Sequence, residues 1–338
     1  MTLATQAEEI SNIAFGYMAS KALFCALELG VFTALADEPQ TAGALAERLG
    51  AAEGPLETLL TALSAARLVA LEDGVWVNSP AADSFLTKGA KYDFGDYLRL
   101  QVGRQMEPLM DQLEGVVRSA PAPEGTNSYA DWFSDPEEAR LYSQSQHAGS
   151  LGPARQLARR VPLEDARHLL DVGGGTGAFA ITLAKAFPDL SVTVVEFETV
   201  AALGRDYVAA EGLSDRIRYV EGDGREAVWP EGQDAVLMSY LFSGVPGPAH
   251  GDLMARAFAH LRPGGRYLVH DFVVNEARTG PPLAALWQLQ HTAFTPGARS
   301  LDEATLRAEL SATGFGEVAV SPMIPGLTML AEGVRPAA

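Results

Sequence analysis

From residue 167 onward, short apolar runs alternate with amphipathic stretches, and this alternation restricts the fold more than any other feature. HLLDVGGG is a strand-like run that ends in a glycine-rich turn, and the helix-like run AFAITLAKAF follows it. The order repeats in SVTVVEF, TVAALGRDYVAAEG and RIRYVEGD. Strands separated by helices pair in parallel, since each helix returns the chain to the same edge of the sheet. The sequence therefore predicts an α/β domain with helices on both faces and ligands beyond the carboxyl ends of the strands.

The N-terminal part of the chain predicts a second domain. Residues 41–49 and 55–67 are typical of short helices, and VALEDGVWVNSP gives two β-type runs around an Asp-Gly turn. Helix, helix and hairpin is the pattern of a winged helix. We expect residues 1–160 to form an all-helical plus winged-helix domain that dimerises and covers the substrate. Residues 161–338 would form the α/β domain.

Charge and cysteine content restrict the partners and the location. With 25 basic and 43 acidic residues the net charge is −18, which opposes binding to nucleic acid and to anionic membranes. The single cysteine, Cys25, permits no intrachain disulfide, and the start MTLATQAEEIS has no basic n-region. We therefore expect a cytoplasmic protein that binds a small molecule.

Residues 13–35 are apolar enough to suggest a membrane span, but Lys21 and Glu28 interrupt them. We interpret this stretch as one or two buried helices that contribute to a subunit interface, and not as a membrane span.

The stretch LLDVGGGTGAF, residues 169–179, carries the strongest local signal. Its glycines allow a tight turn and a close approach of a ligand to the backbone. Dinucleotide enzymes share such turns, so the turn alone is weak evidence. Three acids add to it, because Asp171 precedes the glycines, Glu196 ends the next strand and Asp223 ends the one after. Glu196 is suited to accept both hydroxyls of a ribose, and Asp223 to accept an adenine amino group.

These residues resemble the S-adenosylmethionine-dependent methyltransferases of the Rossmann-like class. The resemblance runs through LLDVGGGTG, VVEF, EGD and AFAHLRPGGRYLV and covers nearly the whole chain. The N-terminal region is similar to that of the small-molecule O-methyltransferase family, the catechol and hydroxyindole type. The resemblance implies S-adenosylmethionine as cofactor and a homodimer formed through the N-terminal helices. The positions that it implies for the cofactor are Asp171, Gly173, Gly174, Gly175, Glu196, Phe197, Asp223, Gly224, Ser239 and Tyr240.

The sequence departs from this family after the fourth strand. O-methylating members carry a His-Asp-Trp stretch there, and its histidine is the base. Here Phe242, Ser243 and Gly244 occupy those places, and none has a pKa suited to a general base near neutral pH. The carbon-methylating branch, which includes the bacteriochlorophyllide C-20 methyltransferases, is similar in having an aromatic residue there and a histidine in a late helix. His291 matches that histidine.

Two Gln/His pairs with helical spacing suggest a polar substrate pocket. Gln144 and His147 are three residues apart, as are Gln288 and His291, so each pair shares a helix face. We interpret His291 as a base or metal ligand that His147 assists, with a hydrogen-bonded core histidine as the alternative. Both imidazoles could hold a divalent metal. We expect the substrate residues to be Gln146, Phe242, Gln288 and Phe294. His168, His250 and His260 are interpreted as solvated.

The leading hypothesis is carbon methylation of an enolisable 2-oxo acid, in which a bound cation would stabilise the attacking enolate. An electron-rich aromatic carbon is the next substrate class. One alternative is O-methylation of a phenolic natural product with His291 as a relocated base. Another is a member of the fold that keeps its cofactor without methylating. A winged-helix DNA-binding regulator is disfavoured by the charge of −18.

Overall fold

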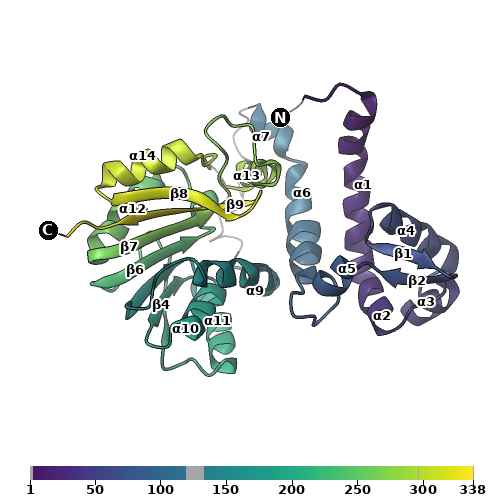
Figure 1. Ribbon diagram of the computed structural model, residues 1–338, viewed down its shortest axis with the longest axis horizontal. Coiled ribbons are helices and arrows are strands. Elements are labelled where there is room, and N and C mark those ends of the chain that lie inside the picture. Colours follow the sequence, from purple (N-terminus) through teal and green to yellow (C-terminus); the bar gives the residue numbers. More distant parts are fainter. Residues whose placement is uncertain (1–2, 119–132, 296, 338) are drawn as a thin grey trace. The chain divides into compact units, whose positions relative to one another are not determined.

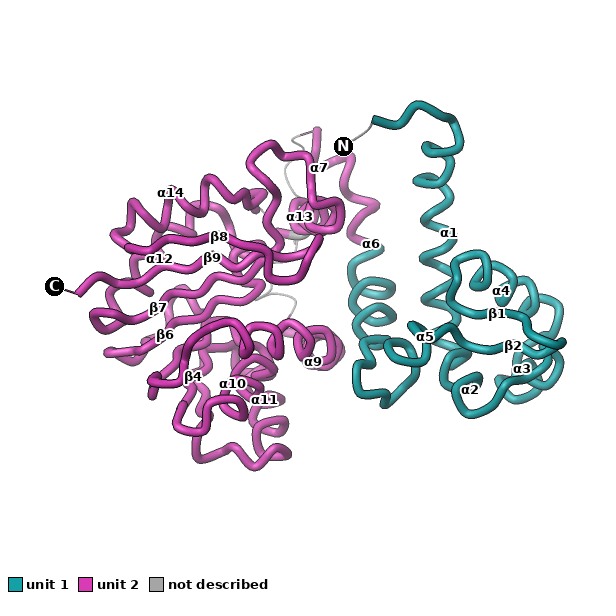
Figure 2. The backbone as a smooth tube through the Cα atoms, viewed as in Figure 1, with its two compact units in different colours: residues 1–107 teal, residues 108–338 magenta. Residues whose placement is uncertain are grey.

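The computed structural model describes residues 3–118, 133–295 and 297–337. The chain divides into two compact units, residues 1–107 and 108–338 (Figure 2). This division lies well before the predicted domain boundary at residue 160, because helix α9 (Pro136–Ala158) packs against α10 and α11 of the second unit.

The first unit is mostly helical. Its elements are α1 (Ala7–Leu29), α2 (Val31–Asp37), α3 (Ala42–Leu49), α4 (Glu53–Ala65), β1 (Val69–Glu72), β2 (Val75–Asn78), α5 (Pro80–Phe85) and the π-helix η1 (Tyr97–Met106). Strands β1 and β2 form the predicted antiparallel hairpin. Asp73 and Gly74 at its turn both have positive φ, 48° and 83°, as a two-residue type I′ turn requires. The order helix, helix, hairpin is as expected, while the winged-helix assignment itself stays a prediction.

Helix α1 differs from its prediction as a buried helix. Within the single chain, Ile13 is 79% exposed and Phe15 is 62% exposed. By length and composition α1 is the one helix among the described residues that is apolar enough to cross a membrane. An apolar helix that its own chain leaves uncovered needs another partner, and a second subunit would meet that need.

The second unit contains the α/β domain (Figure 1). Its elements are α6 (Glu107–Met110), α7 (Leu113–Val117), α9, β3 (His168–Val172), α10 (Ala178–Ala186), β4 (Ser191–Glu196), α11 (Glu198–Ala210), β5 (Ile217–Glu221), β6 (Gln233–Ser239), η2 (Phe242–Gly244), α12 (Ala249–His260), β7 (Leu261–Asp271), α13 (Pro282–Phe294), α14 (Glu303–Thr313), β8 (Gly316–Ile324) and β9 (Thr328–Val334). Helix α6 begins at the last residue of the first unit.

A seven-stranded sheet forms the centre of the second unit, in the order β5-β4-β3-β6-β7-β9-β8. The first five of these strands are parallel, and β8 and β9 form an antiparallel hairpin that closes the sheet at one edge. Alternate residues of β3 enter different cores, with Leu169 on the face of α9, α10 and α11 and Leu170 on the face of α12 and α14. The chain builds outward from β3 in one direction and from β6 in the other. A crevice is expected where the direction changes, between the carboxyl ends of β3 and β6.

Candidate active site

A cavity of about 290 Å³ opens at these strand ends. All ten positions predicted for the cofactor line it, although they come from four separate stretches of the chain: Asp171, Gly173, Gly174, Gly175, Glu196, Phe197, Asp223, Gly224, Ser239 and Tyr240. The remainder of the lining is largely aromatic and aliphatic and includes Phe133, Tyr142, Phe179, Leu241 and Val245. The fold thus places a few polar groups in an apolar cavity, as is typical of small-molecule sites.

The turn after β3 depends on its three consecutive glycines. Gly173 and Gly175 have φ of 70° and 58°, in the left-handed region that favours glycine. A Cβ on Gly174 would lie 2.6 Å from the Asp171 carboxylate and 2.8 Å from Val194. The turn therefore follows β3 closely and presents its backbone to the cavity.

The three acids at the strand ends have different partners. Glu196 accepts hydrogen bonds from the amides of Gly175 and Phe197, both at 2.8 Å. Asp171 is fully buried, and neither of its carboxylate oxygens has a hydrogen-bond partner. Asp223 is paired with the Arg225 guanidinium, with Nε 3.0 Å from Oδ1. Only Asp171 has a whole carboxylate left for a ligand.

Burial sets the ionisation of two of these acids. It raises the pKa of Asp171 to about 7, with a smaller contribution from the Glu196 charge. Burial also raises the pKa of Glu196 to about 7, against the two backbone hydrogen bonds that lower it. Both carboxylates would gain from a ligand that brings hydrogen-bond donors or positive charge. S-Adenosylmethionine brings ribose hydroxyls, an ammonium and a sulfonium, so these residues fit it.

Helix α9 brings Gln146 and His147 to the same cavity. His147 Nδ1 lies 2.8 Å from Thr176 Oγ1 in the glycine turn, and its ring stacks on Tyr207 with centroids 4.0 Å apart. Burial lowers the pKa of His147 to about 4, so this imidazole is neutral at pH 7. Gln146 donates to the Tyr142 hydroxyl at 2.9 Å. His147 therefore lies beside the turn predicted to bind the cofactor.

Two predicted substrate residues have structural contacts instead, and neither lines the cavity. Phe242 is fully buried, and its ring centroid lies 4.6 Å from that of His250. Gln288 donates to the carbonyls of Phe272 and Leu301 and accepts from the Ser300 hydroxyl. Both N–H groups of the Gln288 amide are therefore already used and are not available to a substrate. Helical spacing could not reveal this, because the two carbonyls lie far from Gln288 in the sequence. The side chain of Phe294, the third such prediction in this region, lies outside the described residues.

His291 is buried in α13 and does not belong to the described lining of the cavity. Trp287 Nε1 donates to His291 Nε2 at 3.1 Å, whereas His291 Nδ1 has no partner. Burial lowers the pKa of His291 to about 3, so the ring is neutral. Thr295, one helical turn further along, does line the cavity. The unpartnered nitrogen distinguishes His291 from a core histidine whose hydrogen bonds are complete.

The sequence did not predict the environment of three buried polar residues. Ser143 and Thr295 line the cavity with buried hydroxyls that have no partner, yet isolated Ser and Thr residues carry no sequence signal. The prediction of a solvated His250 is wrong, since that residue is 0% exposed. Its ring contacts Phe242 and Arg299, which come from other parts of the chain, so the sequence around it suggests a surface position.

Two protein-family models match the chain. The O-methyltransferase domain matches residues 121–316, and the O-methyltransferase dimerisation domain matches residues 11–88. The chain belongs to the O-methyltransferase family. It is therefore an S-adenosylmethionine-dependent methyltransferase that acts on a small molecule. The predicted Rossmann-like fold is confirmed, and the N-terminal unit carries a dimerisation domain.

Named relatives of this methyltransferase mostly act on natural products. It is 32% identical over 328 residues to a 3-hydroxy-5-methyl-1-naphthoate 3-O-methyltransferase of Streptomyces sahachiroi, covering 96% of this chain and 94% of that one. It is 31% identical to the N,N-dimethyltransferase OxyT of Streptomyces rimosus, covering 92% and 91%. Human N-acetylserotonin methyltransferase in complex with S-adenosylmethionine has the same fold, with a TM-score of 0.88, 22% identity and full coverage of both chains.

A carbon-methylating relative is also present. The bacteriochlorophyllide d C-20 methyltransferase of Chlorobaculum tepidum is 27% identical over 253 residues and covers 74% of each chain. The naphthoate 3-O-methyltransferase is more similar to this methyltransferase than the C-20 methyltransferase is, so the comparisons favour the O-methyl alternative over the carbon-methylation hypothesis.

The residues predicted to bind a metal do not assemble a metal site. No group of three or more His, Cys, Asp or Glu side chains converges in the part of the chain that the structure describes. His291 Nε2 already accepts from Trp287, and His147 Nδ1 already faces Thr176. These side chains therefore give no support to a bound divalent metal.

Proposed function

We propose that this methyltransferase transfers a methyl group from S-adenosylmethionine to a hydroxyl oxygen of a small aromatic natural product. The similarity to O-methyltransferases of such compounds carries the proposal, and the apolar, partly aromatic cavity supports it. When bound, the cofactor supplies an electrophilic methyl group. The chain must then hold an acceptor oxygen in line with that group and favour its ionised form.

Asp171 and Glu196 are the residues that we propose to hold the cofactor, with Asp223 and the glycine turn. Asp171 offers an unpartnered carboxylate, and Glu196 is oriented by two backbone amides. We propose that His147, beside Thr176, contacts the same ligand and does not serve as the base. With a pKa of about 4, its imidazole is a weak acceptor for the proton of a phenol.

We propose that His291 donates a hydrogen bond to the acceptor molecule at the α13 end of the cavity, where Thr295, one helical turn further along, lines the wall. The indole N–H of Trp287 can only donate, so His291 Nε2 must be the accepting nitrogen. A neutral imidazole then carries its proton on Nδ1, which is the unpartnered atom. An N–H at that position stabilises a phenolate and cannot take up its proton. The proton passes to solvent as the hydroxyl ionises.

One experiment tests which atom is methylated and whether a metal is needed. S-Adenosylhomocysteine release is measured with hydroxynaphthoates, simple phenols and 2-oxo acids, with and without EDTA, and the methylated atom is located by NMR. We expect O-methylated phenols and no effect of EDTA. Products methylated only at carbon would overturn the proposal.

Two variants distinguish a donor from a base at position 291. His291→Gln keeps a donor and has no basic group, so it should retain activity within about tenfold, whereas His291→Phe should lose roughly 10- to 100-fold in kcat/KM. Equal losses in the two variants would reject the donor role.

We also propose a cytoplasmic homodimer formed through α1, since the dimerisation domain includes this exposed apolar helix. Ile13→Asp should shift the protein to a monomer in sedimentation velocity. A dimer that persists in this variant would reject α1 as the interface.

A further inference from the structure

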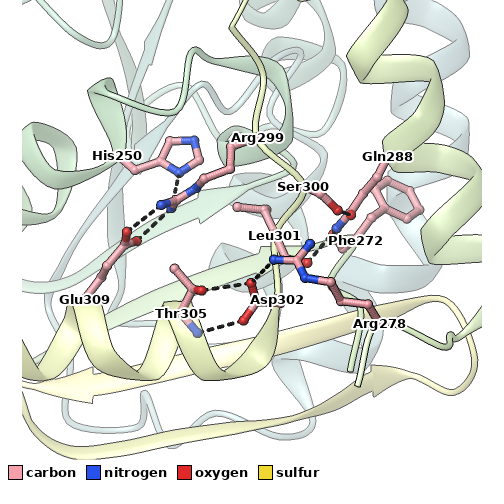
Figure 3. Close-up of polar contacts among 10 residues, drawn as sticks. All are labelled: His250, Phe272, Arg278, Gln288, Arg299, Ser300, Leu301, Asp302, Thr305 and Glu309. Atoms are coloured by element: carbon pink, nitrogen blue, oxygen red, sulfur yellow. Dashed lines mark hydrogen bonds and ion pairs between the residues drawn. The ribbon is translucent and has the colours of Figure 1, made fainter. Parts of the chain in front are cut away.

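Behind the cavity, a network of polar side chains surrounds the segment between α13 and α14 (Figure 3). Arg299 lies at its centre and makes a two-pronged ion pair with Glu309 of α14, at 2.7 and 2.9 Å. The same guanidinium approaches His250 Nδ1 at 3.0 Å. His250, in α12, contacts the carbonyl of Phe242 through Nε2 at 2.9 Å. The chain of contacts thus leads from a half-buried carboxylate to the loop after β6.

Arg299 determines which atoms donate and which accept along this chain of contacts. A guanidinium has only donors, so His250 Nδ1 must accept. The proton of the neutral ring is then on Nε2, where it donates to the Phe242 carbonyl. Burial, followed by the Arg299 charge, lowers the pKa of His250, so this neutral tautomer is the stable form. Glu309 holds Arg299, Arg299 orients His250, and His250 holds the loop.

The loop that His250 holds, residues 241–246, forms one wall of the cavity. Leu241, Gly244, Val245 and Pro246 line the cavity beside Tyr240. Asp271 of β7 holds the loop from the other side by accepting from the Ser243 amide at 3.0 Å. A wall residue that shifts there would displace whatever lies against it.

We propose that His250, Arg299 and Glu309 form a positioning relay that holds loop 241–246 against the cavity and thereby sets the rate of methyl transfer. None of the three touches the cavity, so all act through the loop. The relay requires only methyltransferase activity and is independent of which atom of the acceptor is methylated.

The first readout needs no acceptor. The methyl resonance of bound [methyl-¹³C]S-adenosylmethionine is recorded by NMR for the wild type, His250→Leu and His250→Gln. Leucine removes both polar contacts, whereas glutamine offers an oxygen to Arg299 and an N–H to the Phe242 carbonyl. We expect the resonance to move in His250→Leu and to return toward its original position in His250→Gln.

The second readout is the turnover of the phenol that reacts fastest with the wild type. His250→Leu should lower kcat by about 10- to 100-fold, as expected for a displacement of the order of 1 Å, with KM for S-adenosylmethionine changed less than about threefold. His250→Gln should recover most of kcat. If His250→Leu does not fold, Arg299→Lys provides the test, because it keeps the charge and loses the two-pronged geometry.

Arg278→Met is the matched control. Arg278 pairs with Asp302, a residue of the same segment, at 2.7 Å (Figure 3), and this ion pair does not involve loop 241–246. We expect its kcat and methyl resonance to match those of the wild type. The relay is rejected if Arg278→Met loses as much kcat as His250→Leu, if the glutamine variant shows no recovery, or if the methyl resonance is the same in all variants.

Discussion

The cavity and the region behind it both contain buried polar side chains, but they differ in how those side chains are paired. In the cavity, the Asp171 carboxylate and the hydroxyls of Ser143 and Thr295 have no partner. Behind it, Gln288 reaches two carbonyls and a hydroxyl, and Asp302 caps α14 through the Thr305 amide at 2.9 Å while pairing with Arg278. Burial alone does not distinguish the two regions.

The difference shows where a ligand belongs. A buried polar group without a partner costs about 1–3 kcal/mol, so a protein tolerates it where a ligand will supply the missing contact. A paired group stabilises the fold and is unavailable to a ligand. Changes to the unpaired groups of the cavity should therefore reduce binding, whereas changes to the paired groups behind it should reduce stability.

The largest effect is expected for Asp171→Asn. The neutral amide keeps the shape but removes the charge, and S-adenosylmethionine binding should weaken by roughly 100- to 1,000-fold, or about 3–4 kcal/mol. The free protein should become more stable at pH 8, by about 1–2 kcal/mol, because an unpaired buried carboxylate is lost. Calorimetric titration and thermal unfolding measure the two changes. Loss of stability together with binding would mean that Asp171 is a structural residue.

Two glutamines of α13 make a matched test of the comparison. Gln288 and Gln290 are 6% and 5% exposed, yet the Gln290 amide has no partner. Gln288→Leu leaves the Phe272 carbonyl without its partner, while the Leu301 carbonyl keeps the Val274 amide, so it should lower the free energy of unfolding by about 1–3 kcal/mol. Gln290→Leu should be neutral or stabilise by up to about 1 kcal/mol. Urea unfolding distinguishes them, and equal destabilisation by both changes would contradict the idea that the pairing of a buried glutamine determines what it contributes to stability.

The pH dependence of cofactor binding is the next effect in size. Asp171 and Glu196 have pKa values raised to about 7, so both carry protons in the free protein below that pH. Cofactor binding favours the ionised forms, and its affinity should fall by up to about tenfold per pH unit for each carboxyl below pH 7. The stability of the free protein should change in the opposite sense, decreasing as pH rises from about 4 to about 7 and levelling off above that. Titrations between pH 5.5 and 8.5 test this, and a flat profile would show that neither proton is displaced by binding.

The smallest effect is expected for Thr295→Val. The substitution keeps the shape and removes a hydroxyl that has no partner in the protein. Stability should change by less than about 0.5 kcal/mol, while kcat/KM for the acceptor should fall by roughly threefold. Competition between two phenols, with and without a second oxygen substituent, measures the effect. Thr295 would have no part in recognition if both substrates were affected alike.

The cofactor side of the site was predictable because it depends on local sequence. A strand that ends in glycines, with acids at the ends of the next two strands, must bring these groups to one edge of a parallel sheet. The ten predicted cofactor positions accordingly line one cavity. The substrate side was predicted less well, since Phe242 and Gln288 have structural contacts and His291 is oriented by Trp287.

By itself the sequence determined the βαβ order, the glycine turn, the acids at the strand ends and the lack of a histidine after β6. Each of these follows from the period of a strand or helix or from a special backbone conformation. Only the tertiary structure decided that His250 is buried, that Gln288 is paired while Gln290 is not, and that His291 keeps one nitrogen without a partner. These outcomes depend on contacts between α12, α13, α14 and the loop after β6. Apart from the Trp287–His291 pair, which is one helical turn apart, these contacts join residues far apart in the chain, and periodicity carries no information about them.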